Sequence, residues 1–140
     1  MDNLWIADFE NSRVVRYPNI LAGVSAVGTT GGELSANLVF GQPTLTFAVR
    51  NNQPINFTLT DAYGLAWAGN SLFISVANDG FDRVLYFPAP SSDTNDPVAS
   101  AVLGQPNFIT AVSGQCAQTS LSTPFAVDVT PASSSWPTTS

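Results

Sequence analysis

The chain has 140 residues, of which 44% are apolar and only 10% charged, and its basic residues are four arginines, with no lysine or histidine. Its net charge of −6 argues against a nucleic-acid partner, which would require clustered positive charge, and no basic amphipathic stretch indicates a membrane surface. The single cysteine, Cys116, excludes an internal disulfide and, without histidine, a zinc site built on Cys and His. The low charge is typical of extracytoplasmic or secreted proteins, although no signal peptide is visible in this sequence.

Short apolar segments rich in β-branched and aromatic residues recur along the chain, and clusters of Gly, Pro, Asn and Ser separate them. This pattern predicts an all-β fold, and no window sustains a helical period over three turns. The predicted strands are 4–7, 14–17, 37–40, 64–68, 72–76, 84–87, 99–104 (the weakest) and 125–129. The segments 19–36 and 89–98 are predicted to be surface loops.

Three stretches of the chain each occur in two similar copies. VFGQPTL at 39–45 matches VLGQPNF at 102–108, LWIADFENSRVVRYP at 4–18 matches LFISVANDGFDRVLYFP at 72–88, and LTDAYGLAW at 59–67 matches LSTPFAVDV at 121–129. The repeated unit is therefore about 62 to 70 residues long and supplies four strands. Four-stranded antiparallel sheets in series are typical of β-propeller blades.

The GQP tripeptide is predicted to end the outermost strand of each unit. Glycine permits a sharp departure from the strand, and proline lacks the donor that would continue the ladder. The residues concerned are Gly41, Gln42, Pro43, Gly104, Gln105 and Pro106.

ADFENSRVVRYP and ANDGFDRVLYFP resemble the NHL repeat, and LGQPNF followed by Leu-x-x-Pro resembles the long-repeat NHL proteins that are common in bacteria. The resemblance implies a β-propeller, most often of six blades. It also implies that Asp8 and Arg13 tie a turn to its strand. In the second copy Asn78 takes the aspartate position, while Arg83 is kept.

The resemblance divides the chain into a partial propeller at 1–131 and a Ser/Thr-rich tail at 132–140. Within the propeller, we expect the end of one blade in 1–43, a full blade at about 59–106 and the first strand of a third at 121–131. Because two blades' worth of strands cannot close a ring, the chain is expected to be a fragment of a longer protein or to self-associate.

The turns between the second and third strands of each blade are the candidate ligand face. They carry aromatic, acidic and amide side chains, which suit a protein or carbohydrate partner. The alternative is that Asp, Asn and Gly are simply the residues such turns require. The candidates are Phe9, Glu10, Asn11, Asn78, Asp79, Phe81 and Asp82.

No cofactor is expected, with one alternative: the oxygen atoms of Asn78, Asp79 and Asp82 could hold Ca²⁺. The expected function is a non-enzymatic binding scaffold. A first alternative is part of a metal-dependent propeller hydrolase or lyase of the lactonase kind, with Asp61 or Asp128 as contributors. A second is a purely architectural segment.

Overall fold

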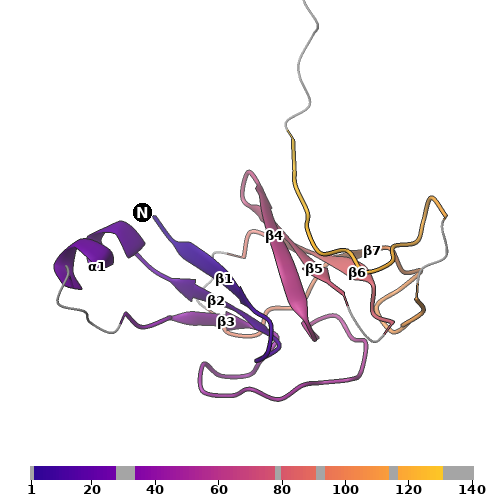
Figure 1. Ribbon diagram of the computed structural model, residues 1–140, viewed down its shortest axis with the longest axis horizontal. Coiled ribbons are helices and arrows are strands. Elements are labelled where there is room, and N and C mark those ends of the chain that lie inside the picture. The colour runs from indigo at the N-terminus through magenta and orange to yellow at the C-terminus, as the bar shows by residue number, and fades with distance from the viewer. Residues whose placement is uncertain (1, 28–33, 78–79, 91–93, 114–116, 131–140) are drawn as a thin grey trace, which may run out of the picture.

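The computed structural model describes residues 2–27, 34–77, 80–90, 94–113 and 117–130. Their strands form two antiparallel sheets, one of three strands in the order β1-β2-β3 and one of four strands in the order β4-β5-β6-β7 (Figure 1). The all-β prediction is confirmed. The strands are β1 (Leu4–Asp8), β2 (Arg13–Tyr17), β3 (Leu38–Phe40), β4 (Ala62–Ala68), β5 (Ser71–Val76), β6 (Arg83–Pro88) and β7 (Ala101–Leu103).

Each sheet contains an equivalent hairpin, β1–β2 or β5–β6, followed by an equivalent outer strand, β3 or β7. In the first sheet Ile6 lies opposite Val15, and Val14 lies opposite Phe40. In the second sheet the matching pairs are Ile74 with Leu85 and Val84 with Leu103. The second sheet adds β4, which pairs with β5 and carries a bulge between Ala62 and Leu65.

Two predictions about local structure are wrong. Within the predicted loop 19–36, a helix, α1, spans Ile20–Val27. Its sequence, ILAGVSAV, is apolar on nearly every side and only eight residues long, so it lacks the apolar–polar period by which a helix is identified. The predicted strand at 125–129 has no strand structure, because no strand in the described part of the chain pairs with it.

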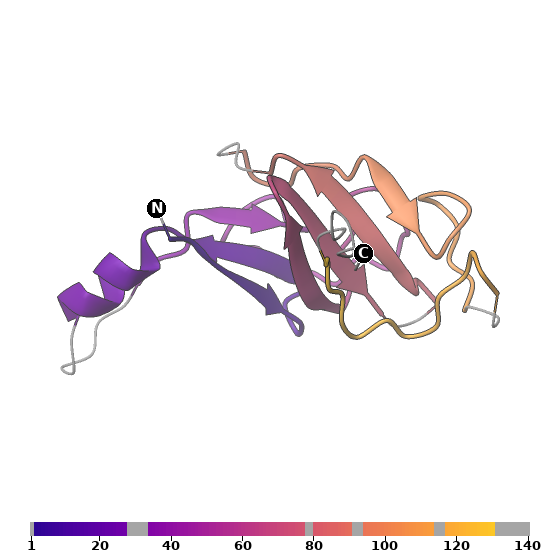
Figure 2. The ribbon, with the colours of Figure 1, turned by 90° about the horizontal axis from the view of Figure 1, so that it is seen from above.

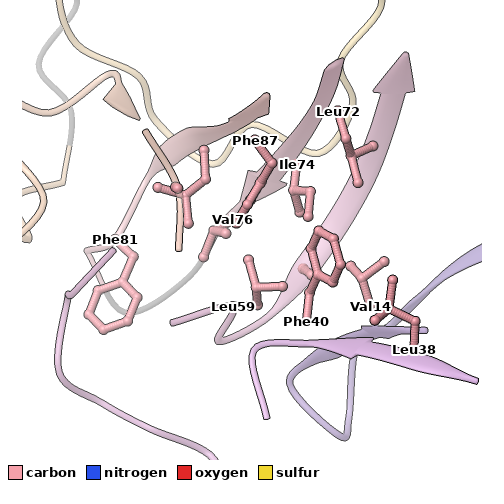
Figure 3. Packing of buried hydrophobic residues seen from close by; sticks show 12 residues of the cluster. Val14, Leu38, Phe40, Leu59, Leu72, Ile74, Val76, Phe81 and Phe87 are labelled. Atoms are coloured by element: carbon pink, nitrogen blue, oxygen red, sulfur yellow. The ribbon is translucent and has the colours of Figure 1, made fainter. Parts of the chain in front are cut away.

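The two sheets lie beside each other (Figure 2), and the hydrophobic core lies between them (Figure 3). Phe40 on β3 and Phe87 on β6 meet with ring centroids 5.1 Å apart, and Trp5 on β1 meets Trp67 on β4 at 5.3 Å. Leu59, which precedes β4, is 1% exposed and belongs to the same core. The sheets therefore bury their facing sides against each other and form one packed body.

The segment before β7 covers the edge of the first sheet. Asp96 N donates to Val39 O at 2.8 Å, Val39 N donates to Asn95 Oδ1 at 3.1 Å, and Gly41 N donates to Asp96 Oδ1 at 3.1 Å. This part of the predicted loop 89–98 thus occupies polar groups of β3 that an edge strand would otherwise leave unpaired.

Candidate functional site

The turn between β1 and β2 is held by a small polar cluster. Arg13 Nε donates to Asp8 Oδ2 at 2.7 Å, and Asn11 Nδ2 lies 2.9 Å from both carboxylate oxygens of Asp8. Arg13 Nη1 also donates to Leu45 O, in the loop after the GQP tripeptide. The expected contact between Asp8 and Arg13 is present, and it ties the turn to that loop.

Arg83 takes the matching position in the second sheet, but it is fully buried. Its Nη1 donates to Phe108 O at 2.9 Å, which repeats the bond from Arg13 to Leu45, and its Nη2 donates to Ile55 O and Thr58 O at 2.9 and 3.0 Å. Burial lowers the pKa of the Arg83 guanidinium to about 10. This cation is held by backbone carbonyl dipoles, and the contact implied for Asn78 falls outside the described residues.

The glutamine of each GQP tripeptide clamps the loop that follows it. Gln42 Nε2 donates to Ser12 O and Val49 O at 3.2 and 2.8 Å, and Val49 N donates back to Gln42 Oε1 at 3.3 Å. Gln105 repeats the arrangement, donating to Asp82 O and Val112 O at 3.3 and 2.8 Å and accepting from Val112 N at 3.3 Å. Sequence reasoning assigned the tripeptide to strand termination alone and missed this clamp.

The glycine of each tripeptide is required by its backbone and by a close neighbour. β3 ends directly before Gly41, as predicted, and β7 ends directly before Gly104, one residue earlier than predicted; the two glycines have φ of 83° and 88°. A Cβ on Gly41 would lie 2.8 Å from Leu59, and one on Gly104 would lie 2.6 Å from Leu121. In both copies of the repeat, a leucine at the equivalent position packs directly against the glycine. Pro43 and Pro106 are exposed.

Three aromatic side chains form a row at one end of the sheets. Phe9, in the turn after β1, lies 4.9 Å from Tyr63 at the start of β4, and Tyr63 lies 4.8 Å from Phe125, measured between ring centroids. Phe125 is 58% exposed, whereas Phe9 and Tyr63 are half-buried. The row (Phe9, Tyr63 and Phe125) brings together residues far apart in the sequence.

The backbone beneath the row explains how it is built. Tyr63 and Gly64 lie in the bulge of β4, and Gly64 N donates to the hydroxyl of the buried Ser75 at 2.7 Å. A Cβ on Gly64 would lie 2.8 Å from the Cα of Ala126, so only glycine lets the chain at 125–126 pass this closely. That passage places Phe125 beside Tyr63. An aromatic residue at the same position of both copies was the signal in the sequence that could have found this pair.

The predicted ligand-face residues divide into three groups. Phe9 is half-buried and belongs to the row, Glu10 beside it is exposed, and Asn11 is used within the turn. Phe81 and Asp82 are only 3% exposed each, so the prediction that they belong to a ligand face is wrong for both. Phe81 packs in the core, with its ring centroid 5.3 Å from the Arg83 guanidinium carbon. Asn78 and Asp79 lie outside the described residues.

The carboxylates considered for metal binding have different surroundings. Asp61 is 1% exposed and pairs with Arg50 at 2.6 Å, and Asp82 Oδ1 accepts from Thr123 N at 2.9 Å. Asp128 is exposed. Across the described ranges, no group of three or more potential metal-ligating side chains comes together.

A groove of about 1190 Å³ runs along the side of the second sheet that faces away from the first. Phe73, Val84 and Leu103 form its floor, and residues 117–121 and 127–129 form its other wall. Its lining is mostly apolar, which distinguishes it from the acidic and amide surface around Glu10.

Comparisons with protein-family models, with curated proteins and with solved structures found no match. None of the helices in the described residues is long and apolar enough to cross a membrane.

Proposed function

We propose that this chain supplies successive blades of an NHL-type β-propeller that acts as a binding scaffold. The repetition of one set of tertiary contacts supports this proposal. The two glutamines make equivalent hydrogen bonds, and Arg13 and Arg83 donate to equivalent carbonyls of the loop. Gly41 and Gly104 each pack against the equivalent leucine. Units that repeat their tertiary contacts in series are typical of propellers and other repeat proteins.

The ligand is proposed to bind at the aromatic row. Aromatic rings with acidic neighbours offer apolar contact area together with attraction for positive charge. The side chains of all four arginines are engaged within the chain, with Asp8, Asn37, Asp61 or backbone carbonyls, while Glu10 beside Phe9 is exposed. The observation that carries the proposal is this aromatic row, with Phe125 58% exposed and the exposed carboxylate of Glu10 beside Phe9. It favours a protein segment that presents apolar and basic side chains.

An array of twelve-residue peptides tests this proposal, with aromatic or aliphatic residues flanked by Arg and Lys. We expect the chain to bind basic apolar peptides, to bind them less when Phe9→Ala or Glu10→Lys is introduced, and to release them at high salt. Leu21→Ala, an exposed apolar residue on α1, and Asp2→Lys are the matched controls and should bind normally.

A glycan array measured in parallel separates the two partner classes. Binding to neutral glycans, lost with Phe9→Ala but retained with Glu10→Lys, would replace the protein partner by a carbohydrate. If neither array shows binding above that of the Phe9→Ala variant, the row is not a ligand site.

The lactonase-like alternative receives less support. Asp61, one of its two proposed metal ligands, is buried and already paired with Arg50. A metal at this carboxylate would have to displace that guanidinium. We therefore retain the scaffold as the proposed function.

A further inference from the structure

The contact between the two sheets has two different sides. The first sheet contributes Trp5, Val14 and Phe40, and the second contributes Leu72, Ile74 and Phe87. We call these the front face of the first sheet and the back face of the second. Because side chains alternate along a strand, each sheet also has the opposite face, formed by the intervening residues.

The repeat identifies those two outward faces. In the aligned copies, Trp5, Val14 and Phe40 correspond to Phe73, Val84 and Leu103, which form the floor of the groove. The groove is therefore the front face of the second sheet.

The same alignment pairs Leu72 and Ile74 with Leu4 and Ile6 on β1, so Leu4 and Ile6 belong to the back face of the first sheet. The chain thus presents, on its two outward sides, the two halves of the interface that it already contains.

Exposure of apolar side chains agrees with this assignment. Phe40 is fully buried, but its counterpart Leu103 is 49% exposed. Leu72 and Ile74 are fully buried, but Leu4 and Ile6 are 41% and 39% exposed. These three side chains are exposed because no second sheet covers them, whereas Val15, Val39 and Val84, on the same two faces, are only 4%, 0% and 8% exposed, so part of each face is open to a partner.

The strands that lack a pairing partner are complementary in the same way. In the second sheet β4 pairs with β5, with Leu65 opposite Ile74 and Trp67 opposite Leu72. In the first sheet β1, the counterpart of β5, pairs with β2 only among the described strands. The counterpart of β4 is the segment 125–129, which belongs to no sheet and lies beside the groove.

We propose that a second copy of this chain docks its first sheet into the groove, and that the segment 125–129 adds to that copy's β1 as an antiparallel strand. Transfer of the register of β4 and β5 places Val127 opposite Ile6, and Val129 opposite Leu4. The segment gains backbone partners, and Leu4, Ile6 and Leu103 leave water. The inference does not depend on the ligand bound at the aromatic row.

This contact is head-to-tail, so each copy keeps one free face of each kind. Such an interface produces a closed ring when the rotation between copies closes, and a filament when it does not. The mass in solution should therefore rise with concentration, by size-exclusion chromatography with light scattering, to a discrete ring or to a series of longer species.

Two variants, each blocking one face, test the direction of the contact. Ile6→Asp blocks the back face and Leu103→Asp blocks the front face, so each alone should remain monomeric. An equal mixture should give a dimer and nothing larger, since only one intact pair of faces remains. Val98→Asp, at a residue 55% exposed and outside the groove lining, should assemble normally.

Cross-linking tests the register. In a Cys116→Ser background, Ile6→Cys mixed with Val127→Cys should give an intermolecular disulfide under mild oxidation, whereas Ile6→Cys mixed with Val98→Cys should not. A far-ultraviolet circular dichroism spectrum of each variant shows that it is folded.

A folded wild-type chain that stays monomeric up to about millimolar concentration would overturn the proposal. So would a mixture of the two blocked variants that fails to dimerise. Failure of peptide or glycan binding would leave the assembly result unchanged, because Phe9→Ala and Glu10→Lys alter neither face of the contact.

Discussion

Gln42 and Gln105 stabilise the loops that follow β3 and β7 because each carboxamide bonds backbone groups both of that loop and of a distant turn. Gln42 is 2% exposed and Gln105 is 7% exposed, so water does not readily replace these bonds. A buried carbonyl that loses its donor costs more than the net value of the hydrogen bond. The glutamine is thus the residue of the tripeptide that connects the strand end to the neighbouring turn.

Gln42→Ala should lower the free energy of unfolding by about 2 kcal/mol, because the carbonyls of Ser12 and Val49 lose their donor. Urea denaturation followed by tryptophan fluorescence measures the change. The control is Thr46→Ala, at an exposed residue of the same loop, which should change stability by less than about 0.5 kcal/mol. Equal effects of the two substitutions would contradict the clamp.

Gly41→Ala should cost about 3 kcal/mol, since it combines a left-handed backbone with a Cβ 2.8 Å from Leu59 and 2.9 Å from Ser12 O. Gly69→Ala separates the two causes, because Gly69 also has a positive φ, 58°, but has no atom within 4 Å of the added Cβ. It should cost about 1 kcal/mol in the same urea experiment. If both substitutions lower the free energy of unfolding equally, the close approach of Leu59 does not contribute to the effect of Gly41→Ala.

At the scale of elements, the edge of β3 depends on two residues from the segment before β7. Asn95 and Asp96 provide the donors and acceptors that a neighbouring strand would provide. The arrangement has an electrostatic cost: burial raises the pKa of the Asp96 carboxyl, although the hydrogen bond from Gly41 N opposes the shift. The folded state therefore holds the Asp96 proton more tightly than the unfolded state does.

This difference determines the pH dependence of Asp96→Asn. As pH rises from the ordinary value of 3.8 through the raised pKa, the wild-type chain loses stability from this group, because the folded state binds more protons than the unfolded state. Asparagine keeps the acceptor for Gly41 N and carries no charge. We expect the variant to match the wild type near pH 3 and to exceed it at pH 7.

Urea midpoints measured between pH 3 and pH 7 test this expectation. Asp2→Asn, at an exposed carboxylate, is the control and should show no such divergence. A variant less stable than the wild type at pH 7 would mean that the charge on Asp96 strengthens the edge contact.

At the scale of the whole molecule, the two sheets share one core and should unfold together. Phe40 lies between them, fully buried and against Phe87. Phe40→Ala should therefore lower the free energy of unfolding of both sheets by about 4 kcal/mol. The Trp5–Trp67 contact across the sheets and the β-sheet signal in circular dichroism should disappear in one coincident transition.

The measurement uses a Trp136→Phe background, so that fluorescence reports on Trp5 and Trp67 alone. Leu21→Ala on α1, where the side chain is 67% exposed, should leave the free energy of unfolding within about 0.5 kcal/mol of the wild-type value. A circular dichroism transition that continues after the fluorescence change is complete would show that one sheet survives without the other.

The amino-acid sequence by itself determined the all-β character, seven of the strands and the residue at which β3 ends. These features depend on local alternation, on turn residues and on the repetition of whole segments, all of which can be read along the chain. The contact of Asp8 with Arg13 was an expectation from the resemblance to the NHL repeat, and the structure contains it.

Only the tertiary structure decided how the repeated segments are used. Gln42 reaches Ser12 across 30 positions, Phe125 reaches Tyr63 across 62, and Phe81 is buried because the core extends beneath its turn. The segment 125–129 has the composition of a strand but forms none, since a strand requires a partner for its backbone groups and not only a suitable sequence. A residue's role is set by the neighbours that folding brings to it, and those neighbours come from distant parts of the chain.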